Sequence, residues 1–527
     1  MSLTDKIIKN TFFHLLSQAI AFLSPLILTP LIIYKIGKVD FGIYVLVLGF
    51  LGSFGLLDIS LSSSFVKFIS EYYHKKEKES LLAVINTGFL FYFIFSLVVA
   101  GIAYIFSDKI ISIINIPPEK ISLGRNALSF GLIIFFLSST FTIFNSVIIG
   151  LQKMYLGAIA SFIVNCLYFT AILILMYSGY GLLSIMITQL ATSVLSIIIT
   201  ITIAKKILPE LKVHPGYFTV KKLKLMGSFG VQMQISRLAT FASEKYDEFL
   251  LGIFTNLSNV TFYNIGNKSA GYGRLMPLQF IAPIAPVAAE LSAKNETDKL
   301  KQLYLDTAKY INTASIPIFV FLIFFSELIL FSWMGEGYDI SALILRILAA
   351  GYLVNFMFSV PGNSIIPNTG KPKYQMYEGL IFLSVNIFLS YFLIKNYGIF
   401  GAAIGCALSV LGSSTYTFFK SNSFFNANAF KVIKDILFRP FLLSIISALF
   451  CYGIYFILNR VNVIGTRVYS ITFLIIIISV YSAFYLFLMI KSKYFSNRDK
   501  LLLLKFLAKI PLFKIFIKKR ISEADED

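Results

Sequence analysis

The sequence is poor in charged residues and in the residue types that build metal and disulfide sites. Only 14% of its 527 residues are charged, and it holds three cysteines and three histidines. Each cysteine (Cys166, Cys406 and Cys451) lies alone in an apolar stretch, which is typical of packing residues and not of redox pairs. The histidines are scattered along the chain, so we predict no metal site.

Motifs for nucleotide-driven or catalytic chemistry are also missing from the sequence. The chain has no GxxxxGKS or GxxxxGKT loop for binding ATP phosphates. It has no grouping of histidine, cysteine and acidic residues that would support hydrolysis. We therefore expect neither an enzymatic activity nor a cofactor.

Hydrophobic residues dominate the sequence instead. They make up 57% of the chain, and the mean hydropathy is +0.80. Runs of about twenty apolar residues, each enough to cross about 30 Å of hydrocarbon, recur along the whole length. This composition excludes an ordinary soluble protein and predicts an all-α polytopic membrane protein.

The apolar runs predict fourteen transmembrane helices. They are expected over residues 11–34, 42–65, 81–106, 127–150, 157–178, 181–204, 227–253, 258–289, 308–333, 342–366, 375–395, 399–420, 439–458 and 468–490.

The formal net charge of +20 comes from basic residues that cluster in alternate loops. Because positive residues favour the cytoplasmic side, this distribution predicts a membrane protein with both termini in the cytoplasm. The same distribution argues against a nucleic-acid partner. Residues 491–520 are basic and rich in leucine and phenylalanine, which predicts an amphipathic helix on the inner leaflet within a cytoplasmic tail at 491–527.

Short segments recur at a spacing of 217 to 219 residues, at equivalent points of the span pattern. The matched pairs are residues 42–44 with 261–263, 145–149 with 363–367, and 179–183 with 396–400. This repeat predicts two six-helix bundles, over residues 1–205 and 221–420, followed by two additional transmembrane helices within 439–490. An even number of helices per bundle gives both the same orientation, related by an axis along the membrane normal.

One stretch, residues 227–274, departs from the apolar pattern. Its two predicted spans carry seven charged residues: Arg237, Glu244, Lys245, Asp247, Glu248, Lys268 and Arg274. A charge in hydrocarbon costs about 2.5–3.5 kcal/mol on the insertion scale, so each of them needs a partner or a wet cavity. Two hypotheses follow: the charges neutralise one another in a structural network, or they line a polar cavity that contacts a cargo. The place of Asp247 and Glu248 near a helix end also fits solvated side chains.

Several predicted spans contain proline, which removes a helix hydrogen bond and kinks or breaks the helix. Kinks or breaks are expected at Pro25, Pro30, Pro277, Pro283, Pro286, Pro361 and Pro367. Such positions suit hinges in a moving structure, although kinks in membrane helices are often merely structural.

Residues 34–72 resemble the start of polysaccharide-transport (Wzx-type) flippases. The shared pattern is a glycine, an acidic residue, an aromatic-Gly-x-Tyr group, and then an acidic turn and a basic residue. In this chain it is formed by Gly37, Asp40, Phe41, Gly42, Tyr44, Asp58 and Lys67, with Ser60 where glycine is more common. Segments 246–254, 261–266 and 363–373 continue the likeness.

The resemblance implies the multidrug/oligosaccharidyl-lipid/polysaccharide exporter fold. It also implies outward transfer of an undecaprenyl-pyrophosphate-linked oligosaccharide for a surface polysaccharide such as O-antigen or capsule. The resemblance further implies a place in the bacterial inner membrane. The lipid bilayer, a polysaccharide polymerase and chain-length proteins would be further partners. A cation-coupled multidrug exporter and a peptidoglycan-precursor flippase on the same fold remain alternatives.

The chemistry of such a cargo suggests roles for the charged residues. Sugar hydroxyls and a diphosphate lose their water in hydrocarbon, and arginine and lysine can replace it with charge-assisted hydrogen bonds. We therefore expect Arg237, Lys268 and Arg274 to bind the cargo. Glu244, Asp247 and Glu248 are the candidate carboxylates for proton or cation coupling, in a cycle in which the two halves rock to alternate access.

Overall fold

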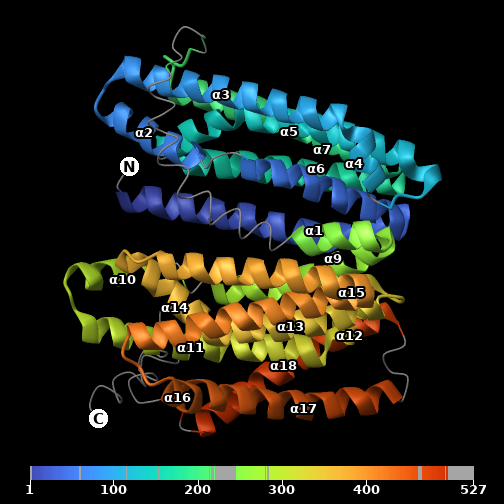
Figure 1. The fold of residues 1–527 in the computed structure, drawn as a ribbon, viewed down its shortest axis with the longest axis vertical. Coiled ribbons are helices and arrows are strands. Elements are labelled where there is room, and N and C mark those ends of the chain that lie inside the picture. The colour runs from blue at the N-terminus through green and yellow to red at the C-terminus, as the bar shows by residue number, and fades with distance from the viewer. Residues whose placement is uncertain are drawn as a thin grey trace. The chain divides into compact units, whose positions relative to one another are not determined.

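In the computed structural model every regular element is a helix, with no strand in the part of the chain that it describes (Figure 1). The described residues are 3–57, 61–113, 115–151, 153–212, 214, 219, 245–278, 281, 284–460, 466–492 and 494–495. Within these ranges ten helices are long and apolar enough to cross a membrane. The predicted all-α membrane fold is confirmed.

The chain forms two compact units, one of Met1–Ile265 with Gly379–Ser409 and the other of Gly266–Glu378 with Val410–Asp527. The predicted boundaries at 205 and 221 mark a sequence repeat, which the compact units do not test, so the two six-helix bundles stay a prediction. The helices α9 and α15 each contribute residues to both units.

The first unit contains the helices α1 to α7, a helix over residues 245–254, and parts of α9 and α15. Aromatic and aliphatic side chains of α2, α3 and α5 form its described core, in which Phe65, Ile85, Ile143 and Val147 are fully buried. The bounds of its numbered helices are α1 Leu3–Leu57, α2 Leu61–His74, α3 Lys78–Ile105, α4 Ser107–Ile113, η1 Pro118–Lys120, α5 Ile121–Gly150, α6 Met154–Tyr177 and α7 Leu182–Ile207.

The second unit contains the remaining helices. Tyr304 and Phe425 stack in its core with their ring centroids 4.7 Å apart. The bounds are α9 Leu257–Leu278, α10 Ile284–Ala293, α11 Thr297–Phe324, α12 Ser326–Met334, α13 Asp339–Phe358, α14 Val360–Ile365, η3 Ile366–Thr369, α15 Lys373–Phe424, α16 Ala429–Lys431, η4 Val432–Leu437, α17 Phe438–Arg460 and α18 Arg467–Lys491.

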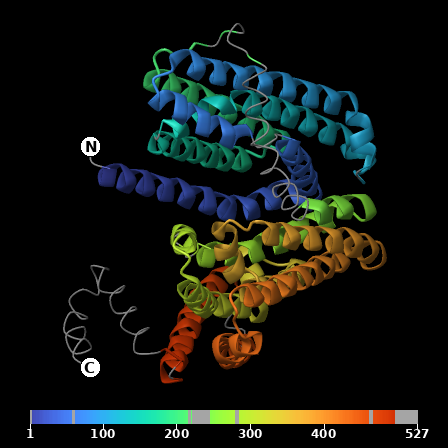
Figure 2. The same ribbon diagram turned by 60° about the vertical axis from the view of Figure 1, so that its left-hand side comes forward.

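Two very long helices each turn at one glycine. The helix α1 breaks at Gly37 (φ 84°), and α15 breaks at Gly398 (φ 57°), a backbone region that other residues rarely adopt. Figure 2 shows the turn within α1, drawn in dark blue. Each of these helices therefore covers two predicted spans, so the ten candidates correspond to twelve of the fourteen predicted spans. The other two are the span at 227–253, most of which lies outside the described residues, and the span at 258–289, which begins with α9. The total of fourteen stays a prediction.

The predicted proline positions gave mixed results. The helix α1 continues through Pro25 and Pro30 and breaks at Gly37, because proline fixes a helical φ whereas glycine alone reaches positive φ at no steric cost. Pro361 and Pro367 do mark breaks, since each is the second residue of a new short helix.

Two predictions fall largely outside the described residues. They concern the span at 227–253, of which only residues 245–253 are described, and the tail at 491–527. Large apolar side chains elsewhere are exposed along α3 and α18, for example Leu97 and Ile475, as expected for lipid-facing helices.

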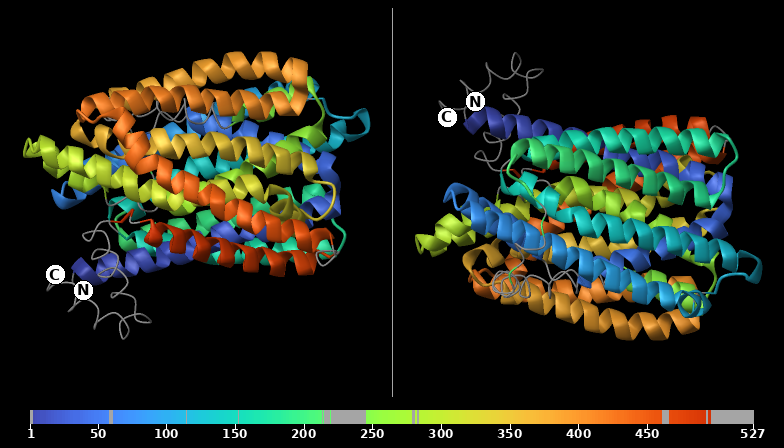
Figure 3. Two further views of the ribbon diagram at one scale, coloured as in Figure 1. Left: turned by 90° about the horizontal axis from the view of Figure 1, so that it is seen from below. Right: turned by 90° about the horizontal axis from the view of Figure 1, so that it is seen from above.

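The last two helices, α17 and α18, lie next to each other in the second unit (Figure 3). Pro317 in α11 has no N–H, so the carbonyl of Thr313, four residues earlier, lacks its helix donor. The Tyr485 hydroxyl of α18 donates to that carbonyl at 3.0 Å, and Tyr481 donates to the Pro317 carbonyl at 3.0 Å. Tyr485 of the added helix thus supplies the hydrogen bond that the proline removes from its neighbour, and Tyr481 adds a second contact to the Pro317 carbonyl.

Replacing Tyr485 with phenylalanine is expected to lower the free energy of unfolding by about 1 kcal/mol, because the Thr313 carbonyl loses its donor. The loss should shrink in a Pro317→Ala background, where a restored amide can bond the same carbonyl. Tyr469→Phe, at an exposed position of the same helix, is the matched control. Thermal unfolding in detergent measures the four variants, and an equal loss for Tyr469→Phe would contradict this assignment.

Candidate functional site

A helical hairpin carries the charged residues singled out in the sequence. The helix over residues 245–254 ends at Thr255, whose hydroxyl donates back to the Leu251 carbonyl at 2.6 Å. Asn256 then caps α9, since its side-chain oxygen accepts from the Asn259 amide at 2.9 Å. These two polar residues set the tight turn that places the two helices against each other.

Asp247 and Glu248 are both buried, with exposed fractions of 1% and 2%. The idea that they are solvated near the end of the helix is therefore wrong. The helix does not end in water here, because its side chains pack against α1, where Gly49 lies beside Lys245 and Phe249. A buried carboxylate is costly unless hydrogen-bond donors or a cation contact it, and these two adjacent carboxyl groups have different partners.

Glu248 is neutralised. One of its carboxylate oxygens accepts from Asn264 of α9 at 2.7 Å, and the other accepts from Lys245, one turn earlier, at 2.8 Å. Lys245 is about one-third exposed, so the ion pair connects a buried carboxylate to a partly exposed lysine. This arrangement matches the first sequence hypothesis, a structural network.

Asp247 has no cationic partner among the described residues. The Tyr263 hydroxyl of α9 donates to its Oδ2 at 2.9 Å, and the side chains of Asn386 and Ser390 in α15 also interact with the carboxyl group. Its Oδ1 is buried without a hydrogen-bond partner. An uncompensated carboxylate surrounded by neutral oxygen and amide groups favours the uptake of a proton or a small cation.

In the second unit, Arg274 lies on α9 against an aromatic ring. Its guanidinium stacks over Tyr352 of α13, with 4.7 Å from Cζ to the ring centroid. The Tyr352 hydroxyl donates to Asn267 at 3.2 Å, and Asn267 lies on the same face of α9, seven residues before Arg274. The Arg274 Nε is buried and has no hydrogen-bond partner. Stacking occupies the face of the guanidinium and leaves its edge for an anion.

Lys268 is half-buried on α9, about 120° around the helix from Arg274 at 100° per residue. The helix therefore does not bring these two predicted cargo-binding residues onto one face. Arg237 and Glu244 lie outside the described residues, so their predicted roles stay predictions.

A further buried carboxyl group escaped the sequence analysis. Glu378 of α15 accepts a hydrogen bond at 2.5 Å from Ser359, which lies between α13 and α14. It accepts another from Asn363 in α14. Asn363 belongs to the segment 363–373 noted for its resemblance, but a lone glutamate at the start of a predicted span gave no signal. In the same way, Asn386 and Ser390 are recognisable only as two polar residues, one turn apart, in a mainly apolar span.

The described ranges hold no group of three or more histidine, cysteine or acidic side chains arranged to hold a metal ion. The polar sites are instead built from one carboxylate or one guanidinium each, with neutral partners. Such sites can bind and release a proton, a monovalent cation or an anionic group without forming a permanent metal centre.

Sequence comparison shows which known proteins this chain resembles. The model of the polysaccharide biosynthesis protein family matches residues 7–295. A Shigella flexneri protein named as a candidate O-antigen transporter is 24% identical over 410 residues, which is 77% of this chain and 95% of that protein. A Haloferax volcanii protein named as a candidate low-salt glycan biosynthesis flippase is 24% identical over 204 residues, 39% of this chain and 42% of that protein.

Solved structures share the fold. The lipid II flippase MurJ in an inward closed conformation gives a TM-score of 0.67 at 17% identity, over 90% of this chain and 99% of MurJ. An inward-facing multidrug resistance MATE family transporter of the MOP superfamily gives 0.65 at 14% identity, over 78% of this chain and 98% of that one. At these identities the likeness shows the fold alone, which is the exporter fold predicted from the sequence.

The two adjacent carboxylates should respond differently to neutral, isosteric replacement. Glu248→Gln leaves Lys245 without its counter-charge and is expected to cost roughly 1–3 kcal/mol of stability. Asp247→Asn removes a charge that has no cationic partner, so stability should stay within about 1 kcal/mol of the parent or rise. Thermal unfolding of the purified variants in the same detergent decides this, and equal losses for both would contradict the assigned partners.

Proposed function

Because the chain belongs to the polysaccharide biosynthesis protein family, we propose that it is a glycan flippase. In this proposal it moves undecaprenyl-pyrophosphate-linked oligosaccharides from the cytoplasmic to the outer leaflet for surface polysaccharide assembly. The polyprenyl tail stays in lipid while the charged headgroup passes through a polar passage. The names of the O-antigen transporter and glycan flippase relatives support transport over catalysis.

The proposal rests mainly on the contacts of the Arg274 side chain. A cation in a membrane helix normally pairs with an acid, but among the described residues Arg274 stacks on Tyr352 and has no ion pair. Stacking orients the guanidinium plane and limits the loss of conformational entropy when an anion binds. A pyrophosphate or acidic sugar offers the planar sets of oxygens that an arginine edge binds through two hydrogen bonds.

We assign ion coupling to Asp247 in preference to the other predicted carboxylates. Glu248 already has a lysine and an amide partner, so a further cation gains little there. Asp247 has one satisfied oxygen and one unsatisfied oxygen, with Asn386 and Ser390 nearby as possible ligands. Binding of a proton or sodium ion at this carboxylate would remove an uncompensated charge and shift the balance between two conformations.

We keep the proposed roles of Arg237 and Lys268 in cargo binding and of Glu244 in ion coupling, for which the structure adds no support. A cation-coupled multidrug exporter and a peptidoglycan-precursor flippase share this fold, so fold alone does not choose among the three. The family match and the unpaired guanidinium favour an anionic, glycan-bearing cargo. A polymerase and chain-length proteins remain expected partners.

In a strain whose surface polysaccharide depends on this gene, Arg274→Ala is expected to reduce export by about tenfold or more, because a charge-assisted contact to the headgroup contributes about 1.5–3 kcal/mol. Arg274→Lys keeps the charge but not the fork, so it should restore only part of the activity. Surface polysaccharide and the accumulated lipid-linked intermediate are measured together at equal protein level.

Arg346→Ala provides the matched control for that experiment. Arg346 is an arginine of the same unit whose charge is already paired with Glu327 at 3.0 Å near the surface. Export should be unchanged in this variant. Full export with Arg274→Ala would refute the role of Arg274, and accumulation of a peptidoglycan precursor in a depletion strain would favour the alternative flippase.

Coupling is tested separately in vesicles that hold the purified protein and a lipid-linked oligosaccharide. Parent protein is expected to flip the cargo faster when a proton or sodium gradient is imposed. Asp247→Asn should abolish this stimulation while leaving a slow basal rate, because the replaced side chain cannot neutralise a cation. A gradient response that survives in Asp247→Asn would exclude this carboxylate as the coupling group.

A further inference from the structure

The break between α13 and α14 contains a buried carboxyl group to which the proposed function gives no role. Glu378 of α15 is only 9% exposed. The Ser359 hydroxyl, at the break, donates to one of its oxygens at 2.5 Å, and the Asn363 amide of α14 donates to the other. Thr417, in the last part of α15, also forms a hydrogen bond with this carboxyl group. All four residues belong to the second unit.

The direction of these hydrogen bonds shows which form of the carboxyl group they fit. The Asn363 side chain donates both to Glu378 and to the Ser359 oxygen, the latter at 3.0 Å. Because the Ser359 oxygen accepts that bond, the single hydrogen of its hydroxyl group points to Glu378. Both neighbours are therefore donors, and such a set fits the ionised carboxylate.

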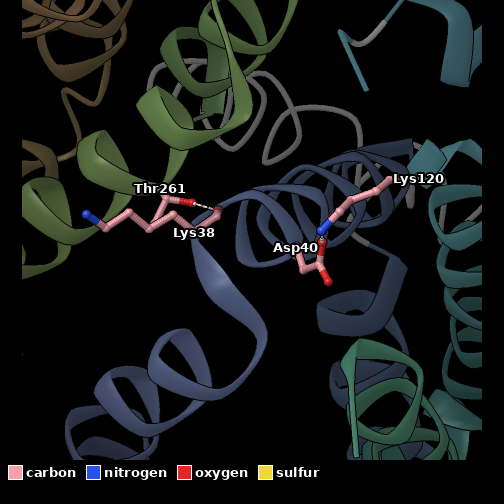
Figure 4. Close-up of polar contacts among 4 residues, drawn as sticks. All are labelled: Lys38, Asp40, Lys120 and Thr261. Carbon is pink, nitrogen blue, oxygen red and sulfur yellow. Dashed lines mark hydrogen bonds and ion pairs between the residues drawn. The ribbon is translucent and has the colours of Figure 1, made fainter. Parts of the chain in front are cut away.

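No cationic side chain in the described part of the chain forms an ion pair with Glu378. The break in α1 at Gly37 provides a contrast, because the nearby Asp40 is paired with Lys120 (Figure 4). A buried carboxylate that has only neutral donors keeps part of its desolvation cost. Uptake of a proton removes that cost at Glu378, whereas Asp40 already has a counter-charge.

Other titratable groups lie toward this end of the surrounding helices. They are Glu290 and Lys294 of α10, Asp298, Lys299, Lys301, Tyr304, Asp306, Lys309 and Tyr310 of α11, Tyr352 of α13, and Lys373, Tyr374, Tyr377, Tyr416 and Lys420 of α15, whereas α14 has none. The tyrosines are neutral below about pH 10. The charged side chains are exposed or contact other groups of the protein, so none of them neutralises Glu378.

The predicted internal repeat indicates that the fold does not require an acid at this place. At a spacing of 218 residues, within the range found for the repeat, α13 and α14 correspond to the single unbroken helix α5. At the same spacing Ser359 corresponds to Phe141, and Glu378 corresponds to Ala160. The buried acid therefore occurs together with the helix break, and its counterpart next to an unbroken helix is an alanine.

A proton can reach Glu378 from the near end of α15. The helix begins at Lys373, and residues 375–377, directly before the glutamate, are exposed. The loop before α15 carries Lys371 and belongs to the side that the basic-residue distribution predicts to be cytoplasmic. The water that supplies the proton is therefore about one helical turn away.

The site can accept a proton without a new cavity. A protonated Glu378 can donate to the Ser359 oxygen, once the Ser359 hydroxyl turns away from it. Serine hydroxyls in helices commonly donate to the carbonyl four residues earlier, which is that of Asn355. The Ser359 backbone amide already donates to this carbonyl at 2.8 Å, so the hydroxyl group lies close to a second acceptor.

We propose that Glu378, Ser359 and Asn363 form a proton-binding site at the break between α13 and α14. The site is separate from Asp247, which belongs to the first unit and has other hydrogen-bond partners. The bound proton turns Glu378 from an acceptor into a donor, and so changes the hydrogen bonds that tie α15 to the helix break. This site goes beyond the proposed flippase function, because it binds protons whether or not a glycan is moved.

Infrared difference spectra of the purified full-length protein in detergent test the proposal. Spectra are compared between about pH 8 and about pH 5, a range in which exposed carboxyl groups of ordinary acidity stay ionised. All proteins carry Asp247→Asn, so that this carboxyl group does not contribute. Glu378→Gln is compared with Glu327→Gln, a matched control at a largely exposed glutamate that is paired with Arg346.

On acidification we expect the carbonyl band of a neutral carboxylic acid to appear in the parent and in Glu327→Gln. The band should be lost in Glu378→Gln, which has no carboxyl group at the break. Absence of an acid band in the parent over this range, or a band that persists in Glu378→Gln, would overturn the proton-binding site.

Ser359→Ala gives a second measure that keeps the carboxyl group and so remains informative if Glu378→Gln does not fold. The variant removes a donor that stabilises the carboxylate, so the acid band should appear at a pH about one unit higher. An unchanged pH would contradict the proposed site. None of these measurements involves transport, so a failure of the flippase function would leave their outcome unaffected.

Discussion

A backbone carbonyl without a donor is costly inside a membrane, and this constraint acts where a described helix contains a proline or ends. The proline in α11 and the end of the helix at 245–254 each leave such carbonyls. A side chain from another part of the chain supplies the donor in each case: Tyr485 and Asn115, respectively. Contacts between residues far apart in the sequence therefore form where a helix lacks its own hydrogen bonds.

The two donors differ in their surroundings. Tyr485 of α18 is buried against α11, where Tyr481 also donates to the Pro317 carbonyl. Asn115 is exposed at the end of the helix over residues 245–254, where water can also reach the carbonyls. The same bonding rule therefore operates both in the buried interior and at an exposed helix end.

The fold was largely predictable from the sequence, because span length, loop charge and glycine or proline punctuation are local signals. The membrane class, the helix-only architecture and the exporter fold followed from them and from the resemblance at residues 34–72. The partners of the charged residues were not predictable. Nothing local distinguishes Asp247 from Glu248, and Asn386 and Ser390 lie more than a hundred residues away from both. The helix α1 breaks at Gly37 and not at Pro25 or Pro30, for the local reason that glycine reaches positive φ, and the proline pattern alone did not predict this.

The two hypotheses for the charged stretch turn out to apply to different residues. Glu248 with Lys245 and Asn264 forms a closed network, and such a network fixes one structure without inviting a ligand. Asp247 and Arg274 are supported by neutral or aromatic groups that orient the charge but do not cancel it. A transporter needs this second kind of site, because a charge already neutralised by the protein has little affinity left for an ion or a phosphate. A charged residue in this chain therefore belongs to the scaffold when the protein neutralises it. It is a candidate site residue when its neighbours only orient the charge.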